Sequence, residues 1–190
     1  METKYEIRKN VLNKRNNMLQ QEVINNSNII MNKLTDLNEY KDSKVVFIYM
    51  SFGNEVVTSE LIKRMLTEKK RVVIPYTDTK NTVLIPSEVK SLEDDLVLNK
   101  FGYYEPEFEK IKLVEPEEFD LIVTPGVAFD KQLNRVGYGK GYYDRILLRK
   151  RNDAKAVAVA FEFQVLDEVP AEFHDIKMDM IITEENTYNK

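Results

Sequence analysis

Apolar residues recur along the chain with two different spacings, which predict alternating helices and strands. Residues 3–19 and 21–37 repeat apolar positions every three or four residues, as amphipathic helices do. Residues 44–50 and 155–161 are short, nearly continuous apolar runs, a pattern typical of strands covered on both faces. We expect further strands at 71–76, 82–86, 119–124 and 178–183, and further helices at 58–69, after residue 141 and across 163–169.

This alternation also predicts the fold class. Strands that alternate with helical segments form a mainly parallel sheet with helices on its faces. We therefore expect residues 1–190 to form a single domain, a Rossmann-like three-layer α/β/α architecture. Pro75 predicts that its strand stops at the sheet rim, and Pro86 predicts an edge strand, because proline cannot donate a ladder hydrogen bond. The aromatic side chains of the acidic segment 87–118 are interpreted as packing against the core.

Composition narrows the class of protein. The 190 residues are 43 % hydrophobic and 32 % charged, with no cysteine and one histidine. No apolar run could span a bilayer and the N-terminus is charged, so we expect a cytoplasmic protein without a membrane partner. The absence of cysteine excludes thiolate chemistry, and the single histidine leaves oxygen ligands for a metal, which favours magnesium. The net charge of −4 argues against nucleic-acid binding, and we expect a monomer.

Three of the six glycines fall within five residues, at Gly137, Gly139 and Gly141. They follow a predicted strand and loop and precede a predicted helix. Glycine permits positive φ angles and lets other atoms approach the backbone closely. Backbone N–H groups at a helix start, with Lys140 and Arg135 nearby, would attract anionic oxygens such as those of a phosphate.

A carboxylate follows this loop. Asp144 could hold a magnesium ion shared with phosphates, because magnesium is commonly bound by one or two carboxylates together with phosphate oxygens. However, GYGKG is neither the P-loop motif nor the dinucleotide-binding fingerprint. From the residues alone, two interpretations stay open: a phosphate-binding loop, and a flexible loop that only caps a helix.

The longer string TPGVAFDKQLNRVGYGKGYYDR, residues 124–145, resembles the signature of the 5-formyltetrahydrofolate cyclo-ligase (5,10-methenyltetrahydrofolate synthetase) family. Further blocks resemble the family in the same order: KYEIR at 4–8, YMSFGNE at 49–55, and the C-terminal segment 170–184. Together they span nearly the whole chain. The resemblance implies an enzyme that uses ATP, with magnesium as cofactor, to close 5-formyltetrahydrofolate to 5,10-methenyltetrahydrofolate with release of ADP and phosphate.

The resemblance also implies roles for individual residues. Lys140, Arg135 and Tyr142 would be catalytic, and Asp144 and Asp179 would lie together and hold magnesium. The residues implied to bind ATP are Lys4, Arg8, Arg135, Val136, Gly137, Tyr138, Gly139, Lys140, Gly141, Tyr142 and Tyr143. The residues implied to bind the folate are Arg8, Met50, Glu55, Tyr138, Gly139, Lys140, Gly141 and Tyr142.

Three positions carry a different interpretation. Arg15 shares a helical face with Lys4 and Arg8, but the resemblance gives it no role, and we interpret it as a surface residue. His174 is interpreted as fixing its loop and not as catalytic. Tyr138 stands where many relatives have arginine, so this loop offers a single hydroxyl near the transferred phosphate.

Two rival functions have distinguishable signatures. A non-catalytic folate- or nucleotide-binding protein would be indicated by loss of Lys140 or Asp144, and both are present. A small-molecule kinase would need a general base beside the phosphate acceptor, which we do not identify. Sugar-phosphate isomerases and CoA-transferases would share only the layered architecture, which is weak evidence for function.

Overall fold

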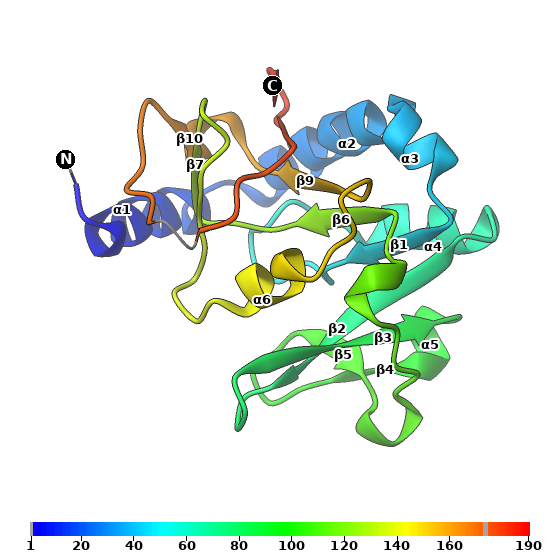
Figure 1. Ribbon diagram of the computed structural model, residues 1–190. Helices are drawn as coiled ribbons and strands as arrows, with labels where there is room; N and C mark the ends of the chain where they lie inside the picture. Colours follow the sequence, from blue (N-terminus) through cyan, green and yellow to red (C-terminus); the bar gives the residue numbers. More distant parts are fainter. Residues whose placement is uncertain (1, 173–174) are drawn as a thin grey trace.

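The computed structural model describes residues 2–172 and 175–190 and is built around one seven-stranded sheet (Figure 1). Its strands are β1 (Val45–Ile48), β2 (Arg71–Asp78), β3 (Val83–Val89), β6 (Leu121–Thr124), β9 (Lys155–Val159), β11 (Met180–Ile182) and β12 (Thr187–Asn189). Their order is β12–β11–β9–β6–β1–β2–β3. The five inner strands are parallel, and the two edge strands pair antiparallel. The expected mainly parallel α/β fold is confirmed.

Helices cover both faces of this sheet. They are α2 (Gln20–Asp36), α3 (Asn38–Asp42), α4 (Ser59–Thr67) and α6 (Tyr142–Leu148). Helix α1 (Lys4–Asn16) instead packs through Ile7 and Val11 against Val127, Ala128 and Val136, outside the two cores of this sheet. Alternate strand residues point to opposite faces, so Val46 joins the core beneath α2 and α4, whereas Phe47 joins the core beneath α6. Figure 1 shows α2 and α6 on opposite sides of the strands. In the described part of the chain, no helix is both long and apolar enough to cross a bilayer.

Several short elements were not predicted from the sequence. Of residues 163–169, which we expected to be helical, only 163–164 are, as the end of a single-turn 3-10 helix, and 165–166 form a short strand. The large aromatic residues Phe101 and Phe108 are exposed instead of packed in the core. Two small sheets accompany the main one, β4–β5 and β10–β7–β8. The short elements are α5 (Leu92–Asp95), β4 (Leu96–Leu98), β5 (Tyr104–Pro106), η1 (Phe108–Lys110), η2 (Pro116–Glu118), β7 (Ala128–Asp130), β8 (Arg135–Val136), η3 (Glu162–Gln164) and β10 (Val165–Leu166).

Pro75 does not end its strand, so that prediction was wrong. β2 continues to Asp78, and beyond Val73 it pairs with β3 alone. Pro75 lies directly opposite Pro86, and two facing residues without N–H groups fit a position of the ladder where no hydrogen bond is exchanged. β3 is an edge strand, as Pro86 predicted.

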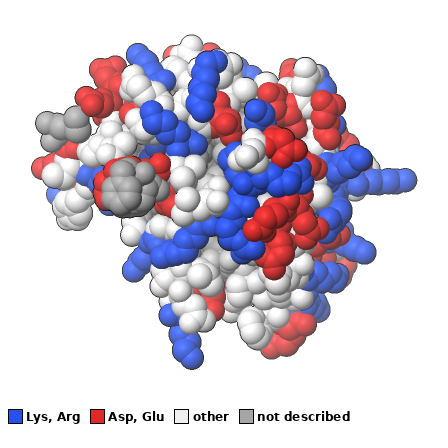
Figure 2. Space-filling model, in the orientation of Figure 1, with Lys and Arg blue, Asp and Glu red and all other residues white. Residues whose placement is uncertain are grey.

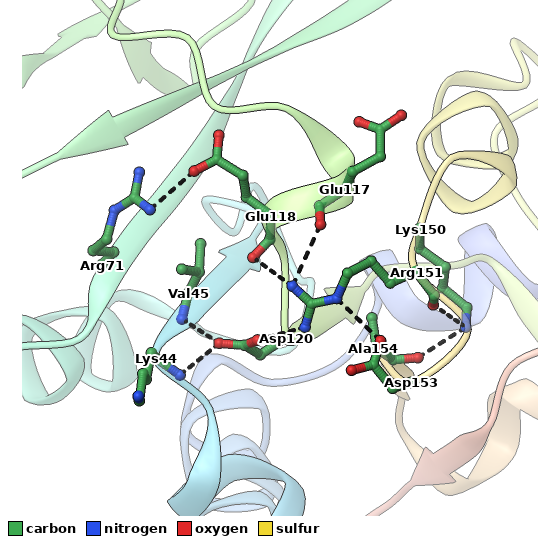
Figure 3. Close-up of polar contacts among 10 residues, drawn as sticks. All are labelled: Lys44, Val45, Arg71, Glu117, Glu118, Asp120, Lys150, Arg151, Asp153 and Ala154. Atoms are coloured by element: carbon green, nitrogen blue, oxygen red, sulfur yellow. Dashed lines mark hydrogen bonds and ion pairs between the residues drawn. The ribbon is translucent and has the colours of Figure 1, made fainter.

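Charged side chains fasten the amino end of the sheet (Figure 3). Asp120, directly before β6, accepts hydrogen bonds from the N–H groups of Lys44 (2.8 Å) and Val45 (2.9 Å) at the start of β1. Its second oxygen accepts from Arg151 at 2.8 Å. Lys150 donates to the carbonyl of Ala154, just before β9, at 2.8 Å. These contacts join the neighbouring strands β1, β6 and β9 and give the charged groups hydrogen-bond partners.

Candidate functional site

A pocket of about 560 Å³ opens at the other, carboxyl end of the sheet, between α1, the loop after β8 and the start of α6. Figure 2 shows basic side chains across the middle of the face that carries α6, with acidic side chains beside them. The pocket brings α1 together with a loop about 130 residues later in the chain. Its lining includes every residue that the resemblance implies for ATP, and also Asp144: Lys4, Arg8, Arg135, Val136, Gly137, Tyr138, Gly139, Lys140, Gly141, Tyr142, Tyr143 and Asp144.

Residues 137–141, called the glycine loop below, need glycine at two positions. Gly139 has φ of +97° and Gly141 has φ of +65°, in the left-handed region that residues with a Cβ atom rarely adopt. The loop is anchored by Arg8, whose Nε donates to the carbonyl of Gly137 at 2.7 Å. Because α6 has only seven residues, its dipole adds little, and basic side chains supply most of the positive potential.

Arg135 and Asp144 form the buried side of the pocket. Nη2 of Arg135 lies 2.7 Å from Oδ1 of Asp144, and the arginine side chain is only 4 % exposed. Its guanidinium also lies 5.8 Å from the ring centre of Tyr143, a cation–π contact. Asp144 is partly exposed to the pocket and carries two carboxylate oxygens, so it can pair with Arg135 and still bind a cation.

Two lysines of the pocket differ in their contacts. Within residues 2–172 and 175–190, the amino group of Lys140 forms neither a hydrogen bond nor an ion pair, and its side chain is exposed. Lys4 instead lies 2.7 Å from Asp175 and 2.9 Å from Glu172. Burial opposes the charged form of Lys4, but these carboxylates outweigh burial and raise its pKa, so Lys4 is cationic. His174 lies outside the described residues.

Glu55, in the loop after β1, lies beyond this pocket but is bonded to its loop. The hydroxyl of Tyr138 donates to Oε1 of Glu55, and the N–H of Phe52 donates to Oε2 at 3.0 Å. Nη2 of Arg15 donates to the same hydroxyl at 2.8 Å. The interpretation of Arg15 as a surface residue was wrong, because it is 6 % exposed. The helical periodicity could not show that a distant loop covers this part of α1.

In this group burial outweighs the contacts that favour ionised Glu55, so the pKa of its carboxyl is raised overall. Burial raises the pKa of the Glu55 carboxyl, whereas the hydrogen bond from Tyr138, the charge of Arg15 and the N–H of Phe52 act in the opposite direction. Burial and the charge of Glu55 raise the pKa of the Tyr138 hydroxyl. Tyr138 therefore keeps its proton and acts as the donor to Glu55.

Besides Glu55, two more assigned residues lie away from the pocket lining. Met50 is half-buried after β1 and packs against the core beneath α2 and α4. Asp179, directly before β11, accepts the N–H of Ala156 at 2.8 Å and lies 3.7 Å from Nζ of Lys150. These contacts place Asp179 at the amino end of the sheet, whereas Asp144 lies at the carboxyl end. The expected pairing of Asp144 with Asp179 is not found.

The sequence held a signal against that pairing. A residue directly before a parallel strand lies at the amino end, whereas ligands of α/β sheets gather at the carboxyl end. No cluster of three or more histidine, cysteine, aspartate or glutamate residues suited to a metal occurs in the described part of the chain. Sequence reasoning also gave no site role to five residues of the pocket lining: Leu84, Arg145, Leu148, Glu172 and Asp175.

Comparisons with known proteins agree with the architecture and the motifs. The model of the 5-formyltetrahydrofolate cyclo-ligase family matches residues 1–184. The chain is 34 % identical over 189 residues to the "Probable 5-formyltetrahydrofolate cyclo-ligase" of Schizosaccharomyces pombe, covering 92 % of each chain. It is similar to the solution structure of 5,10-methenyltetrahydrofolate synthetase from Aquifex aeolicus (TM-score 0.85, 36 % identity, 98 % of this chain and 92 % of that one). It is also similar to the synthetase structure from Mycoplasma pneumoniae (TM-score 0.78, 25 % identity, 96 % and 99 %).

Proposed function

The chain belongs to the 5-formyltetrahydrofolate cyclo-ligase family, and from this we propose that it uses ATP and magnesium to convert 5-formyltetrahydrofolate into 5,10-methenyltetrahydrofolate, ADP and phosphate. The observation that carries the proposal is the single pocket that gathers Lys4, Arg8 and the 135–144 segment. Its size and its basic lining suit the phosphates of a nucleotide.

The reaction needs an activated oxygen. The formyl oxygen of the substrate is a poor leaving group, so direct attack by N10 on the formyl carbon is slow. Transfer of the terminal phosphoryl group of ATP to this oxygen converts it into phosphate, and N10 then attacks the formyl carbon and closes the five-membered ring as phosphate leaves. The protein contributes chiefly by positioning both substrates and balancing charge.

Basic residues would bind the phosphates. Lys140, whose amino group has no partner in the described part of the chain, would donate to the transferred phosphoryl group. Arg8 fixes the loop through Gly137 and keeps its terminal nitrogens for a second set of phosphate oxygens. Arg135, held by Asp144, would contribute charge from the buried side. Positive φ at Gly139 lets the backbone bend around the ligand.

The donor set of the pocket fits a magnesium ion carried by phosphates. Magnesium usually retains water and takes one or two carboxylates besides phosphate oxygens, and Asp144 is a partly exposed carboxylate within this pocket. We assign Asp144 alone to this role, since Asp179 bonds to Ala156 at the opposite end of the sheet. When bound, the ion would neutralise the charge of the transferred phosphoryl group.

The folate would lie beside Glu55 and the glycine loop. The carboxylate of Glu55 can accept hydrogen bonds from the pterin ring, and Met50, which also follows β1, can pack against it. Tyr142, at the first position of α6, would stack on or bond to the ring from the pocket side. Tyr138 bridges the two substrates, because it belongs to the phosphate loop and contacts Glu55.

One assay tests the reaction directly. Purified protein is mixed with 5-formyltetrahydrofolate, ATP and magnesium, and the methenyl chromophore and ADP are measured together. We expect equal amounts of both products and loss of both when magnesium is chelated. A stable phosphorylated folate without ring closure would indicate a kinase, and folate binding without either product would indicate a binding protein; each result would overturn the proposal.

A further inference from the structure

Arg15 is a buried cation that the proposed chemistry does not use. Its Nη2 donates to the Tyr138 hydroxyl, and its guanidinium lies 5.7 Å from the centre of that ring. Its Nε is buried without a partner, and it forms no ion pair within residues 2–172 and 175–190. Burying a guanidinium with unfilled donors costs free energy. Packing of α1 alone therefore gives no reason for an arginine here.

Glu55 faces Arg15 across the Tyr138 hydroxyl. Glu55 is 9 % exposed, and a carboxylate this deeply buried favours its neutral form unless a charge opposes that preference. The titratable groups that face it are Arg15 from α1, Tyr138 from the glycine loop, Tyr49 at the end of β1 and Tyr143 from α6. The three tyrosines are neutral, because burial raises the pKa of each hydroxyl. The pKa of Glu55 stays raised by burial, and the two largest effects that oppose burial are the hydrogen bond from Tyr138 and then the positive charge of Arg15.

We propose that Arg15 is a positioning residue for the folate site, where it holds the Tyr138 hydroxyl against the Glu55 carboxylate and faces that carboxylate with its positive charge. The inference deepens the proposed function and rests on it, since the ligand is the pterin ring of 5-formyltetrahydrofolate. That ring presents a ring N–H and an exocyclic amino group side by side. A carboxylate accepts this pair of donors only when it is ionised, because a protonated carboxyl turns one acceptor into a donor.

Glu55 has unused acceptor positions for this ligand. An ionised carboxylate offers about four acceptor positions. Tyr138 and the N–H of Phe52 occupy one on each oxygen of Glu55. Two positions remain for the two ring donors, so the ring can bind without breaking the contacts that align the carboxylate.

Equilibrium binding of 5-formyltetrahydrofolate, measured from acid to alkaline pH, tests the role of Arg15. Removing the positive charge raises the pKa of Glu55, and binding requires the ionised form, so binding is lost at a higher pH than in the wild type. We expect Arg15→Met to weaken folate binding about tenfold or more at neutral pH, with recovery as the pH rises. Arg15→Lys, which keeps the charge, should restore most of the affinity, and the KM for ATP should change far less than the KM for folate.

Three controls separate positioning from simple damage. Lys9→Met removes an exposed charge from the same helix and should bind folate like the wild type. Thermal unfolding identifies variants that fail to fold. In a Glu55→Gln background, which cannot titrate, Arg15→Met should add little to the loss of folate affinity. An equal loss at every pH, or a full additional loss in that background, would overturn the inference.

A readout without folate separates this inference from the proposed function. Carbon-13 NMR of carboxyl-labelled glutamate follows the titration of Glu55, whose signal is assigned by its absence in Glu55→Gln. We expect Arg15→Met to raise the pKa of Glu55 by about one unit or more. An unchanged titration would overturn the role of Arg15 even if the enzyme forms product, whereas a raised pKa in a protein that binds no folate would refute only the proposed function.

Discussion

At the amino end of the central sheet, the cationic groups of Arg151 and Lys150 are bound by carboxylates and backbone carbonyls, whereas at the carboxyl end Lys140 has no partner in the described part of the chain. Arg8, also at the carboxyl end, bonds through Nε to one backbone carbonyl. Filled donors stabilise the fold, and unfilled donors can bind an incoming anion. Lys4 and Arg135 of the pocket are already paired with carboxylates, so Lys140 and Arg8 are the pocket cations that keep donors for an incoming anion.

We expect the largest difference in kcat between variants of two lysines, Lys140 and Lys150, which lie just before and just after α6. We expect Lys140→Met to lower kcat by about 10²–10³-fold with unchanged unfolding temperature, because it removes a donor to the transferred phosphoryl group. Lys150→Met should keep kcat and lose about 1 kcal/mol of stability, because its bond to Ala154 is lost. Steady-state kinetics and urea unfolding of both variants give the comparison. A similar loss of kcat in both would refute the distinction between the two ends.

The next effect concerns two aspartates. Asp144→Asn should weaken the apparent affinity for magnesium about 10–100-fold, because it removes the one carboxylate we assign to the ion. Asp179→Asn should leave the magnesium dependence unchanged and lower stability, since its carboxylate holds the N–H of Ala156. Activity is measured over a range of magnesium concentrations. An equal loss of apparent magnesium affinity in Asp179→Asn would mean that both aspartates bind the ion, as the resemblance implied.

A third prediction concerns the contribution of Asp120, at the amino end of the sheet, to stability. Asp120→Asn should lower the free energy of unfolding by about 2 kcal/mol and leave kcat unchanged. Burial opposes ionisation of Asp120, but the N–H of Val45, Arg151 and the N–H of Lys44 outweigh it and lower its pKa. A carboxyl whose pKa falls on folding stabilises the protein above its unfolded pKa, and this stabilisation disappears as the pH falls through the folded pKa.

Urea unfolding at neutral and acid pH tests whether the stabilisation by Asp120 is lost as the pH falls. The difference in stability between the wild type and Asp120→Asn should shrink on acidification. A difference that stays constant with pH would mean that the carboxylate charge contributes nothing, and that only the shape of the side chain matters.

The smallest effect is expected at the surface. Arg149 contacts Glu115 and Glu117, but all three side chains are about half exposed. Exposed ion pairs are weakened by water and salt, so Arg149→Ala should change stability by less than about 1 kcal/mol and leave kcat unchanged. Unfolding at low and high salt measures it. A loss as large as that of Asp120→Asn would show that exposure does not distinguish these contacts.

The sequence predicted the main strands and long helices because apolar periodicity reflects burial directly. It did not predict β12, the two small sheets or the continuation of β2 past Pro75, since short strands depend on their partners more than on their own residues. For the site, the motifs indicated which residues gather around the glycine loop. They did not reveal the burial of Arg15, which depends on Tyr138, 123 positions later in the chain.

By itself, the sequence determined the α/β class, the glycine cluster in which Gly139 and Gly141 take positive φ, and membership of a family whose motifs span the chain. Local periodicity and backbone sterics act between near neighbours, so a linear pattern records them. Only the tertiary structure decided that Asp144 and Asp179 lie at opposite ends of the sheet, and that Arg15 faces Glu55. Electrostatic interactions depend on distance in space and on burial, and both arise only when remote segments pack together.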